Sequence, residues 1–205
     1  MKPRLRVALA LLLSLAGACA GAQDLAGCSE HFDAVAVPAL PDGWRSAGTA
    51  HVDGWSTAAG NSDNRPNAAH LADHGAQRYD AALLSPVFVV PAQGAVLRFR
   101  QRRAYSWANT VGVLEISIAG GAFTDIAASG GEFLEGPYDG RSFASNPLGP
   151  RRAWITKPEG YTETRVRLPV AARGKTAQLR FRAGSAGTGD DSPGWYLDSI
   201  TCNAP

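Results

Sequence analysis

The sequence lacks every short motif that would name a reaction. It contains no Gly-x-Ser-x-Gly nucleophile elbow, no His-Glu-x-x-His zinc helix and no glycine pattern of the phosphate-cradling type. Enzymes that rely on these motifs are therefore disfavoured. Glycosidases need only two carboxylates, and 18 Asp and Glu side chains are available, but nothing in the sequence selects a pair. A class, a compartment and an architecture can be inferred, whereas the ligand cannot.

Long apolar runs are also scarce, and the only one lies at the amino terminus. Basic residues precede the apolar residues 7–15, and the small residues AGACAGAQ follow. This layout is typical of a secretory signal peptide covering residues 1–22, with cleavage after Ala22. Lipoprotein processing at Cys19 is the alternative. No later segment approaches about 20 consecutive apolar residues, so the sequence predicts no transmembrane segment and a secreted, periplasmic or cell-surface protein.

An excess of basic charge is missing once the leader is removed. Residues 23–205 carry 17 Lys and Arg against 18 Asp and Glu, a formal net charge of −1. Nucleic-acid binding requires clustered basic charge, so no nucleic-acid partner is expected. The length of residues 23–205 fits a single domain.

Cysteine is rare, and its positions are informative. With Cys19 in the leader, Cys28 and Cys202 remain near the two ends of the domain. An exported chain folds in an oxidising compartment, which favours pairing. We therefore predict a disulfide that brings the first and last segments side by side, with two free thiols as the alternative.

Helical periodicity is weak, and alternation of apolar and polar residues is frequent. Strands are expected at residues 85–90, 95–103, 112–118, 162–170, 177–183 and 194–202. In GVLEISIAGGAFTDI, alternation predicts one buried face, and Gly120 and Gly121 can supply the positive φ angles of a hairpin. Residues 67–84 are the best helical candidate, but Gly75 interrupts them, so we expect a loop. The fold class is all-β, a two-sheet antiparallel β-sandwich of the jelly-roll type.

Two long segments, residues 53–82 and 127–160, resist strand assignment. Loops on a rigid β scaffold commonly house binding sites. Trp154 and Tyr138 lie in the second segment and are the best candidates for ligand binding, because an aromatic ring can stack on a sugar. Packing in the core is the alternative for each of these rings.

Charged and metal-binding patterns are less specific. Six arginines are expected to point away from the core: Arg98, Arg100, Arg165, Arg167, Arg180 and Arg182. They can line one surface for an anionic polysaccharide or lipid head group, or simply solubilise the sheets by pairing with neighbours such as Glu115 and Glu163. His70 and His74 have the spacing of zinc ligands on a helix, but no third ligand or stable helix accompanies them.

Several motifs, taken in order, resemble an exported bacterial jelly-roll module. They are LLSPVFVV, VLRFRQR, GVLEISIAGGAFTDI, GGEFLEGPY, NPLGPRRAW, LRFR and GWYLDSI. The likeness covers Cys28 to Cys202 and is to accessory domains of immune inhibitor A-type metallopeptidases and of surface adhesins, related in layout to the MAM domain. It implies a non-catalytic binding or adhesion module whose partner is a glycan or a cell-surface protein.

The ends of the chain also resemble those of MAM domains, in CSEHFD and WYLDSITC. By that resemblance Asp33 and Asp198 are expected to hold a structural calcium ion. Two carboxylates are too few for calcium, so backbone carbonyls would have to complete the shell. The segment before GVLEIS is WANTV, which departs from the family pattern and removes any contact usually supplied there. The alternatives to a binding module are a carbohydrate-active hydrolase and a structural subunit of the envelope, and the oligomeric state is open.

Overall fold

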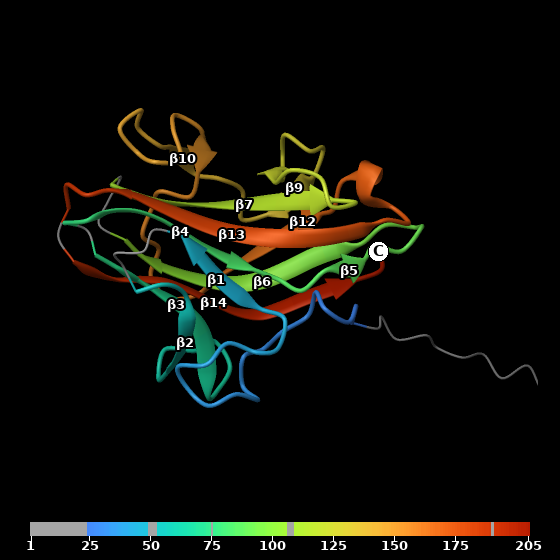
Figure 1. Cartoon of the computed structure of the whole chain (residues 1–205), viewed down its shortest axis with the longest axis horizontal. Coiled ribbons are helices and arrows are strands. Elements are labelled where there is room, and N and C mark those ends of the chain that lie inside the picture. Colours follow the sequence, from blue (N-terminus) through green and yellow to red (C-terminus); the bar gives the residue numbers. More distant parts are fainter. Residues whose placement is uncertain (1–23, 49–52, 75, 106–108, 190) are drawn as a thin grey trace, which may run out of the picture.

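The computed structural model describes residues 24–48, 53–74, 76–105, 109–189 and 191–205. In this part of the chain the regular structure is almost entirely β, in two antiparallel sheets packed face to face (Figure 1). The fold class predicted from the sequence is therefore confirmed. The predicted signal peptide and Cys19 lie outside the described residues. Within those ranges no helix is long and apolar enough to cross a membrane.

The first sheet has the strand order β1-β4-β13-β7-β8, with β5 also paired to β13. Its strands are β1 (Arg45–Gly48), β4 (Arg78–Leu84), β5 (Phe88–Val89), β7 (Thr110–Ile118), β8 (Thr124–Asp125) and β13 (Thr176–Ala186). The second sheet has the order β2-β3-β14-β6-β12-β9. Its strands are β2 (Ser56–Ala59), β3 (Asn67–Asp73), β6 (Val96–Ala104), β9 (Glu132–Glu135), β12 (Thr162–Arg167) and β14 (Ser192–Asn203). A short pair, β10 (Gly140–Arg141) and β11 (Arg152–Ala153), and one 3-10 turn, η1 (Val170–Ala172), complete the elements described.

The core lies between the two sheets and follows the period-two pattern of the strands. On β13, Leu179 and Phe181 are fully buried, whereas Arg180 and Arg182 point to the outer face. Aromatic rings from both sheets meet edge to face, with Phe99 5.2 Å from Phe181 and Trp195 6.4 Å from Phe181 between ring centroids. Non-local contacts between the sheets therefore fix which face of each strand reaches solvent.

The hairpin around Gly120 forms as expected, with two corrections. Strand β7 pairs with β8 through Glu115 opposite Asp125, and the positive φ angles fall on Ala119 (52°) and Gly120 (73°), one residue earlier than predicted. The outer face of β7 is also not solvated, because Glu115 is only 2% exposed. Arg151, which lies C-terminal to the hairpin, covers Glu115 on that face. Alternation of apolar and polar residues predicted a solvent-exposed glutamate, whereas Glu115 is a buried polar residue.

Residues 67–84 form two strands, which corrects the prediction of a loop there. Strand β3 is central in the second sheet, between β2 and β14, and most of its residues are buried. Strand β4 runs between β1 and β13, with Tyr79, Ala81 and Leu83 facing the core. Alanines of both strands are buried, Ala69 and Ala81 in the core and Ala68 and Ala82 on the other face. Of the two expected loops, only the 127–160 segment is largely irregular.

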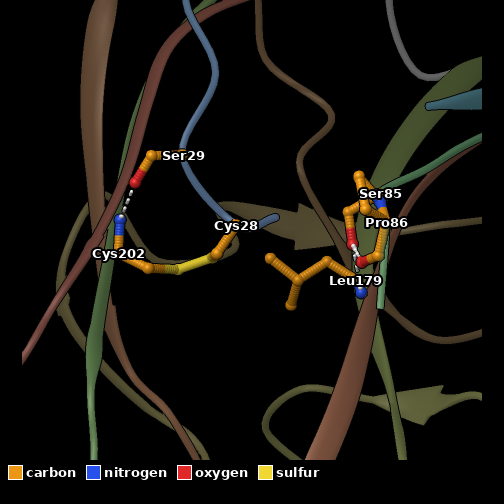
Figure 2. The surroundings of a disulfide bond; sticks show 6 residues. All are labelled: Cys28, Ser29, Ser85, Pro86, Leu179 and Cys202. Atoms are coloured by element: carbon orange, nitrogen blue, oxygen red, sulfur yellow. Dashed lines mark hydrogen bonds between the residues drawn. A yellow bond between two sulfur atoms is a disulfide. The ribbon is translucent and has the colours of Figure 1, made fainter. Parts of the chain in front are cut away.

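Cys28 and Cys202 form the predicted disulfide (Figure 2). The N-terminal segment runs beside β14, where the N–H of Leu25 donates to the carbonyl of Cys202 (2.8 Å). The Ser29 hydroxyl accepts the N–H of Cys202 at 3.0 Å, and Leu179 of β13 points toward Cys28 from the facing sheet. The bond thus ties the first described segment to the last strand at the edge of the core.

Candidate functional site

A hollow near the long irregular segment lies on the outer face of the first sheet. It is a cavity of about 660 Å³ whose lining comes from β7, β8, β13 and the 123–152 region. A neighbouring hollow of about 400 Å³ over β1 and β4 shares Arg180 and Arg182 with it. We refer to the two together as the arginine groove. Its main cavity is lined by Glu115, Phe123, Thr124, Asp125, Ala127, Ala128, Phe133, Pro137, Tyr138, Arg151, Arg152, Arg180 and Arg182.

Glu115 is the buried anchor of the arginine groove. Its carboxylate accepts Arg151 Nη1 at 2.6 Å and Arg180 Nη2 at 2.5 Å, and Arg182 Nη1 lies 3.5 Å away. The Glu115 side chain is 3% exposed, whereas the three arginine side chains retain 23 to 25% of their exposure. A molecule in the groove would therefore meet guanidinium groups above and the carboxylate only beneath them.

Two further carboxylates hold the arginines at the sides. Arg151 Nη2 donates to Asp125 at 2.6 Å, and Arg182 donates to both oxygens of Asp80 at 2.8 and 2.5 Å. Burial lowers the pKa of Arg151, but hydrogen bonds to Asp125 and Glu115 outweigh it and leave that pKa above its ordinary value. The hydrogen bond to Asp80 likewise raises the pKa of Arg182. Bidentate and shared pairs of this kind fix guanidinium planes before any ligand arrives.

Aromatic rings supply the apolar part of the lining. The guanidinium carbon of Arg180 lies 4.3 Å from the ring centroid of Phe123, a cation–π contact. Phe123 and Phe133 are both partly exposed. The cavity thus combines apolar ring faces with convergent hydrogen-bond donors, which is the composition typical of small-molecule and sugar sites.

The structure places Trp154 in the core, which corrects its assignment as a sugar-stacking ring. Its exposure is 0%, and it packs against Phe99, Tyr138 and Trp195 with its Nε1–H donating to the carbonyl of Gly136 (3.0 Å). A ring with no exposed face cannot stack on a ligand. Sequence position in a long irregular segment did not reveal that this tryptophan turns inward.

Tyr138 is also mostly buried, at 5% exposure, but it borders the arginine groove. Its hydroxyl lies 3.0 Å from Asp125 Oδ2 and accepts the N–H of Leu114 at 3.0 Å. Burial and the Asp125 charge raise the pKa of this phenol well above its ordinary value. Its ring face is used in packing, so Tyr138 belongs to the wall of the groove and not to a stacking platform.

The six outward arginines do not share one surface. Arg98, Arg100, Arg165 and Arg167 lie on β6 and β12 of the second sheet, whereas Arg180 and Arg182 lie on β13 of the first. Pairing with neighbouring carboxylates is confirmed: Arg98 Nη2 lies 2.5 Å from Glu163, and Arg180 pairs with Glu115. Arg151, which completes the groove, gave no signal in the sequence because it belongs to no strand pattern.

The two histidines with zinc-like spacing do not sit on a helix. His70 lies within β3, stacks on Tyr196 at 4.2 Å between centroids, and its Nε2 is 2.7 Å from the carbonyl of Pro193. Burial lowers its pKa. Among the residues that the structure describes, no group of three or more His, Cys, Asp and Glu side chains is arranged to hold a metal ion.

Asp33 and Asp198, the two residues expected to hold calcium, lie close together beside the 63–67 segment. Asp198 is fully buried and accepts backbone N–H groups from Asp63 (2.7 Å), Asn64 (3.1 Å) and Ser199 (2.6 Å). The side-chain amide of Asn64 lies between the two carboxylates and donates to Asp33 Oδ2 at 3.2 Å and to Asp198 Oδ1 at 3.3 Å. Burial raises the pKa of Asp198 to about 6, opposed by its backbone hydrogen bonds.

Fold and groove together define a two-sheet β-sandwich module with a polar groove on one outer face. No family model matches the sequence, and no curated protein matches it. The structure is similar to the K1 cleaved adhesin domain of Lys-gingipain from Porphyromonas gingivalis (TM-score 0.52, 16% identity, 86% of this chain and 97% of that one). It is also similar to the K3 cleaved adhesin domain of the same protein (TM-score 0.50, 17% identity, 90% and 100%).

A carbohydrate-binding module in complex with β-1,4-galactotriose gives a TM-score of 0.48 at 11% identity, over 80% of this chain and 90% of that one. That likeness is too weak to add to the argument. The two adhesin domains, at identities below 20%, share the β-sandwich fold of this chain.

Proposed function

We propose that this protein is an exported, non-catalytic binding module and that its arginine groove binds a glycan. The observation that carries the proposal is the main cavity of about 660 Å³, in which partly exposed phenylalanine rings lie beside fixed guanidinium and carboxylate groups. A sugar has apolar ring faces and hydroxyl edges, and such a lining complements both. The disulfide, the signal-peptide pattern and the resemblance to MAM-like and immune inhibitor A-type accessory domains support the export and the binding role.

The carboxylates of the groove are better suited to binding than to hydrolysis. A glycosidase needs one carboxyl group that donates a proton to the leaving oxygen and a second that acts as base or nucleophile. Glu115 and Asp125 both accept hydrogen bonds from Arg151, and Glu115 lies beneath the guanidinium layer. Their arrangement therefore supports a role in holding the arginines.

Phe123→Ala is expected to weaken glycan binding about tenfold, which corresponds to about 1.4 kcal/mol. The change removes an apolar face from the groove and the ring that supports Arg180, while the core stays intact. The measurement is binding of the purified protein to an array of bacterial and plant polysaccharides, followed by titration calorimetry on the positive ones.

Phe143→Ala is the matched control, because Phe143 lies in the same irregular region at 55% exposure and is not part of the groove lining. It should leave affinity unchanged. Equal losses in both variants would contradict the assignment of the groove. A well-folded protein that binds no glycan would refute the glycan proposal and point to a cell-surface protein as partner.

We also propose a structural calcium ion at Asp33 and Asp198, the two residues to which the MAM-like ends of the chain point. The Asn64 amide contacts one oxygen of each carboxylate, Asp33 Oδ2 at 3.2 Å and Asp198 Oδ1 at 3.3 Å, so the two carboxylates lie close together. Calcium takes six to eight oxygens, so backbone carbonyls and water would have to complete the shell around these two side chains. The ion would link the N-terminal segment to β14 alongside the disulfide.

Removing calcium is expected to lower the melting temperature. If free calcium is about 100 times its Kd, binding stabilises the fold by about 2.7 kcal/mol, or about 5 to 11 °C for a domain of this size. Calorimetric melting in calcium and in EDTA measures the effect, with magnesium as the control ion. Asp33→Asn should abolish most of the calcium-dependent shift. An identical melt in calcium and EDTA would contradict the proposal and leave the Asn64 amide as the group that joins the two carboxylates.

A further inference from the structure

We infer that the arginine groove selects acidic saccharides, with a carboxylate of the sugar held by the guanidinium groups of Arg180 and its neighbours. This inference rests on the proposed glycan-binding function and names the substrate class of the same site. It follows from the balance of charge at the surface of the groove, from the way the arginines are fixed, and from the openness of the sheet beside them.

The charge that a ligand would meet in the groove is positive. The two hollows of the groove are together lined by four arginines and three carboxylates, Asp80 being the one in the second hollow, so one positive charge is in excess. Two of the carboxylates line the main cavity. One of these carboxylates, Glu115, has 3% of its side chain exposed, whereas Arg151 and Arg180 each retain 23%. Its negative charge therefore holds the arginines from below and is screened from the cavity. Asp125, at 18% exposure, is the only other carboxylate of the main lining.

The arginines are fixed before a ligand binds. Arg180 donates from both Nε and Nη2 to Glu115 and stacks on Phe123, so two residues hold it, one on β7 and one in the turn that precedes β8. Arg182 is held by Asp80 and Glu115, and Arg151 by Glu115 and Asp125. A guanidinium group that is already ordered loses little entropy on binding an anion, and its planar fork matches a carboxylate. A neutral sugar offers these guanidinium groups hydrogen-bond acceptors but no negative charge to balance the excess positive charge of the groove.

The neighbouring part of the groove is low and open. Beyond Arg180 and Arg182 its lining is Ala47, Gly48, Asp80, Ala82 and Leu84 on β1 and β4. At Gly48 a side chain has no room, since a Cβ atom would lie 2.2 Å from the Asp80 carbonyl oxygen. The described part of this lining consists mostly of small side chains. The second hollow adjoins the main cavity at Arg180 and Arg182, so a ligand longer than one sugar unit can span both, which favours a polysaccharide chain over a single sugar.

The test compares ligands that differ only in charge. Titration calorimetry of the purified protein would use polygalacturonate and the same polymer after methyl esterification, with dextran sulfate as a sulfated anion and β-1,4-galactan as a neutral polymer. We expect polygalacturonate to bind at least tenfold more tightly than its methyl ester. Arg180→Gln should lower that affinity at least tenfold, whereas Arg165→Gln, an exposed arginine on the opposite sheet, should not change it.

The outcomes distinguish failure of the acidic specificity from failure of the glycan-binding function. Equal binding of the acid and the ester, lost in Phe123→Ala, would overturn the acidic specificity and keep the glycan site. Equal losses in Arg180→Gln and Arg165→Gln would mean diffuse charge attraction and would also overturn it. Preference for dextran sulfate over polygalacturonate would overturn the carboxylate assignment. Absence of binding to all four polymers and to the wider array would refute the glycan function itself.

Thermal melting of each variant separates loss of affinity from loss of fold. Arg180→Lys keeps the positive charge but lacks the planar guanidinium fork, so it should recover only part of the affinity that Arg180→Gln loses.

Discussion

Trp154→Ala is expected to lower the free energy of unfolding by about 3 to 5 kcal/mol, the range for truncating a fully buried tryptophan. Trp154 has no exposed surface, and its ring contacts aromatic residues of both the second sheet and the irregular segment. Truncation leaves a cavity that rigid neighbours cannot fill and removes the hydrogen bond to Gly136. At about 2 to 4 °C per kcal/mol, the melting temperature should fall by about 6 °C or more.

Denaturant unfolding of this variant beside Phe143→Ala is the direct measurement. The control removes an exposed ring from the same region and should change stability by less than about 0.5 kcal/mol. The fold account would be contradicted if Trp154→Ala melted like the unchanged protein while losing glycan affinity. In that event Trp154 would be a ligand contact, as its position in the sequence suggested.

Several strands and their core faces were predictable from the sequence, whereas the burial of Trp154 was not. Strands with alternating apolar residues, such as β6, β7 and β13, are evident because each has one face in a common core. The fold class follows from that pattern, and the Cys28–Cys202 bond was predicted from the signal-peptide pattern and the positions of the two cysteines. The direction of a single ring in an irregular segment depends on contacts with distant residues such as Phe99, and no local period encodes it.

Strands β3 and β4 were missed for a different reason. Their sequence, NAAHLADHGAQRYDAALL, is rich in alanine and leucine, which favour helices when no other constraint acts. Both strands are nevertheless flanked by strands on each side, β3 by β2 and β14 and β4 by β1 and β13. Hydrogen bonding to those neighbours outweighs the helical propensity of alanine and leucine.

The arginine groove was only partly predictable. Pairing of Arg180 with Glu115 was anticipated, as was the use of the 127–160 region, which supplies several lining residues. The burial of Glu115 was not anticipated, because the alternation of apolar and polar residues assigns its side chain to the face of the strand that normally meets water. Arg151 is 36 positions from Glu115 along the chain, and their contact arises only when the irregular segment folds back over β7. A site whose residues lie this far apart along the chain leaves no short motif in the sequence.

Glu115→Gln should be the most disruptive single change within the groove. One carboxylate there serves three guanidinium groups, so its neutralisation leaves Arg151, Arg180 and Arg182 close together with less compensating charge. Breaking a buried pair by removing one partner costs about 3 to 5 kcal/mol, and the quarter exposure of the arginines places the expected loss near the lower end, about 3 kcal/mol. Acidic-glycan affinity should fall as well, because the guanidinium groups lose the contacts that fix their planes.

The matched control is Glu163→Gln, which breaks the pair with Arg98 on the opposite sheet. Arg98 is 56% exposed, and an exposed pair contributes about 0 to 1 kcal/mol. A double-mutant cycle with Arg180→Gln isolates the coupling: the double variant should be less destabilised than the sum of the two single changes, since it removes a positive charge that Glu115→Gln leaves uncompensated. Strict additivity, or a loss in Glu115→Gln no larger than in Glu163→Gln, would show that Glu115 does not anchor the arginines. The specificity inferred for the groove would then lack its physical basis, because unanchored arginines on an open sheet attract anions without selecting among them.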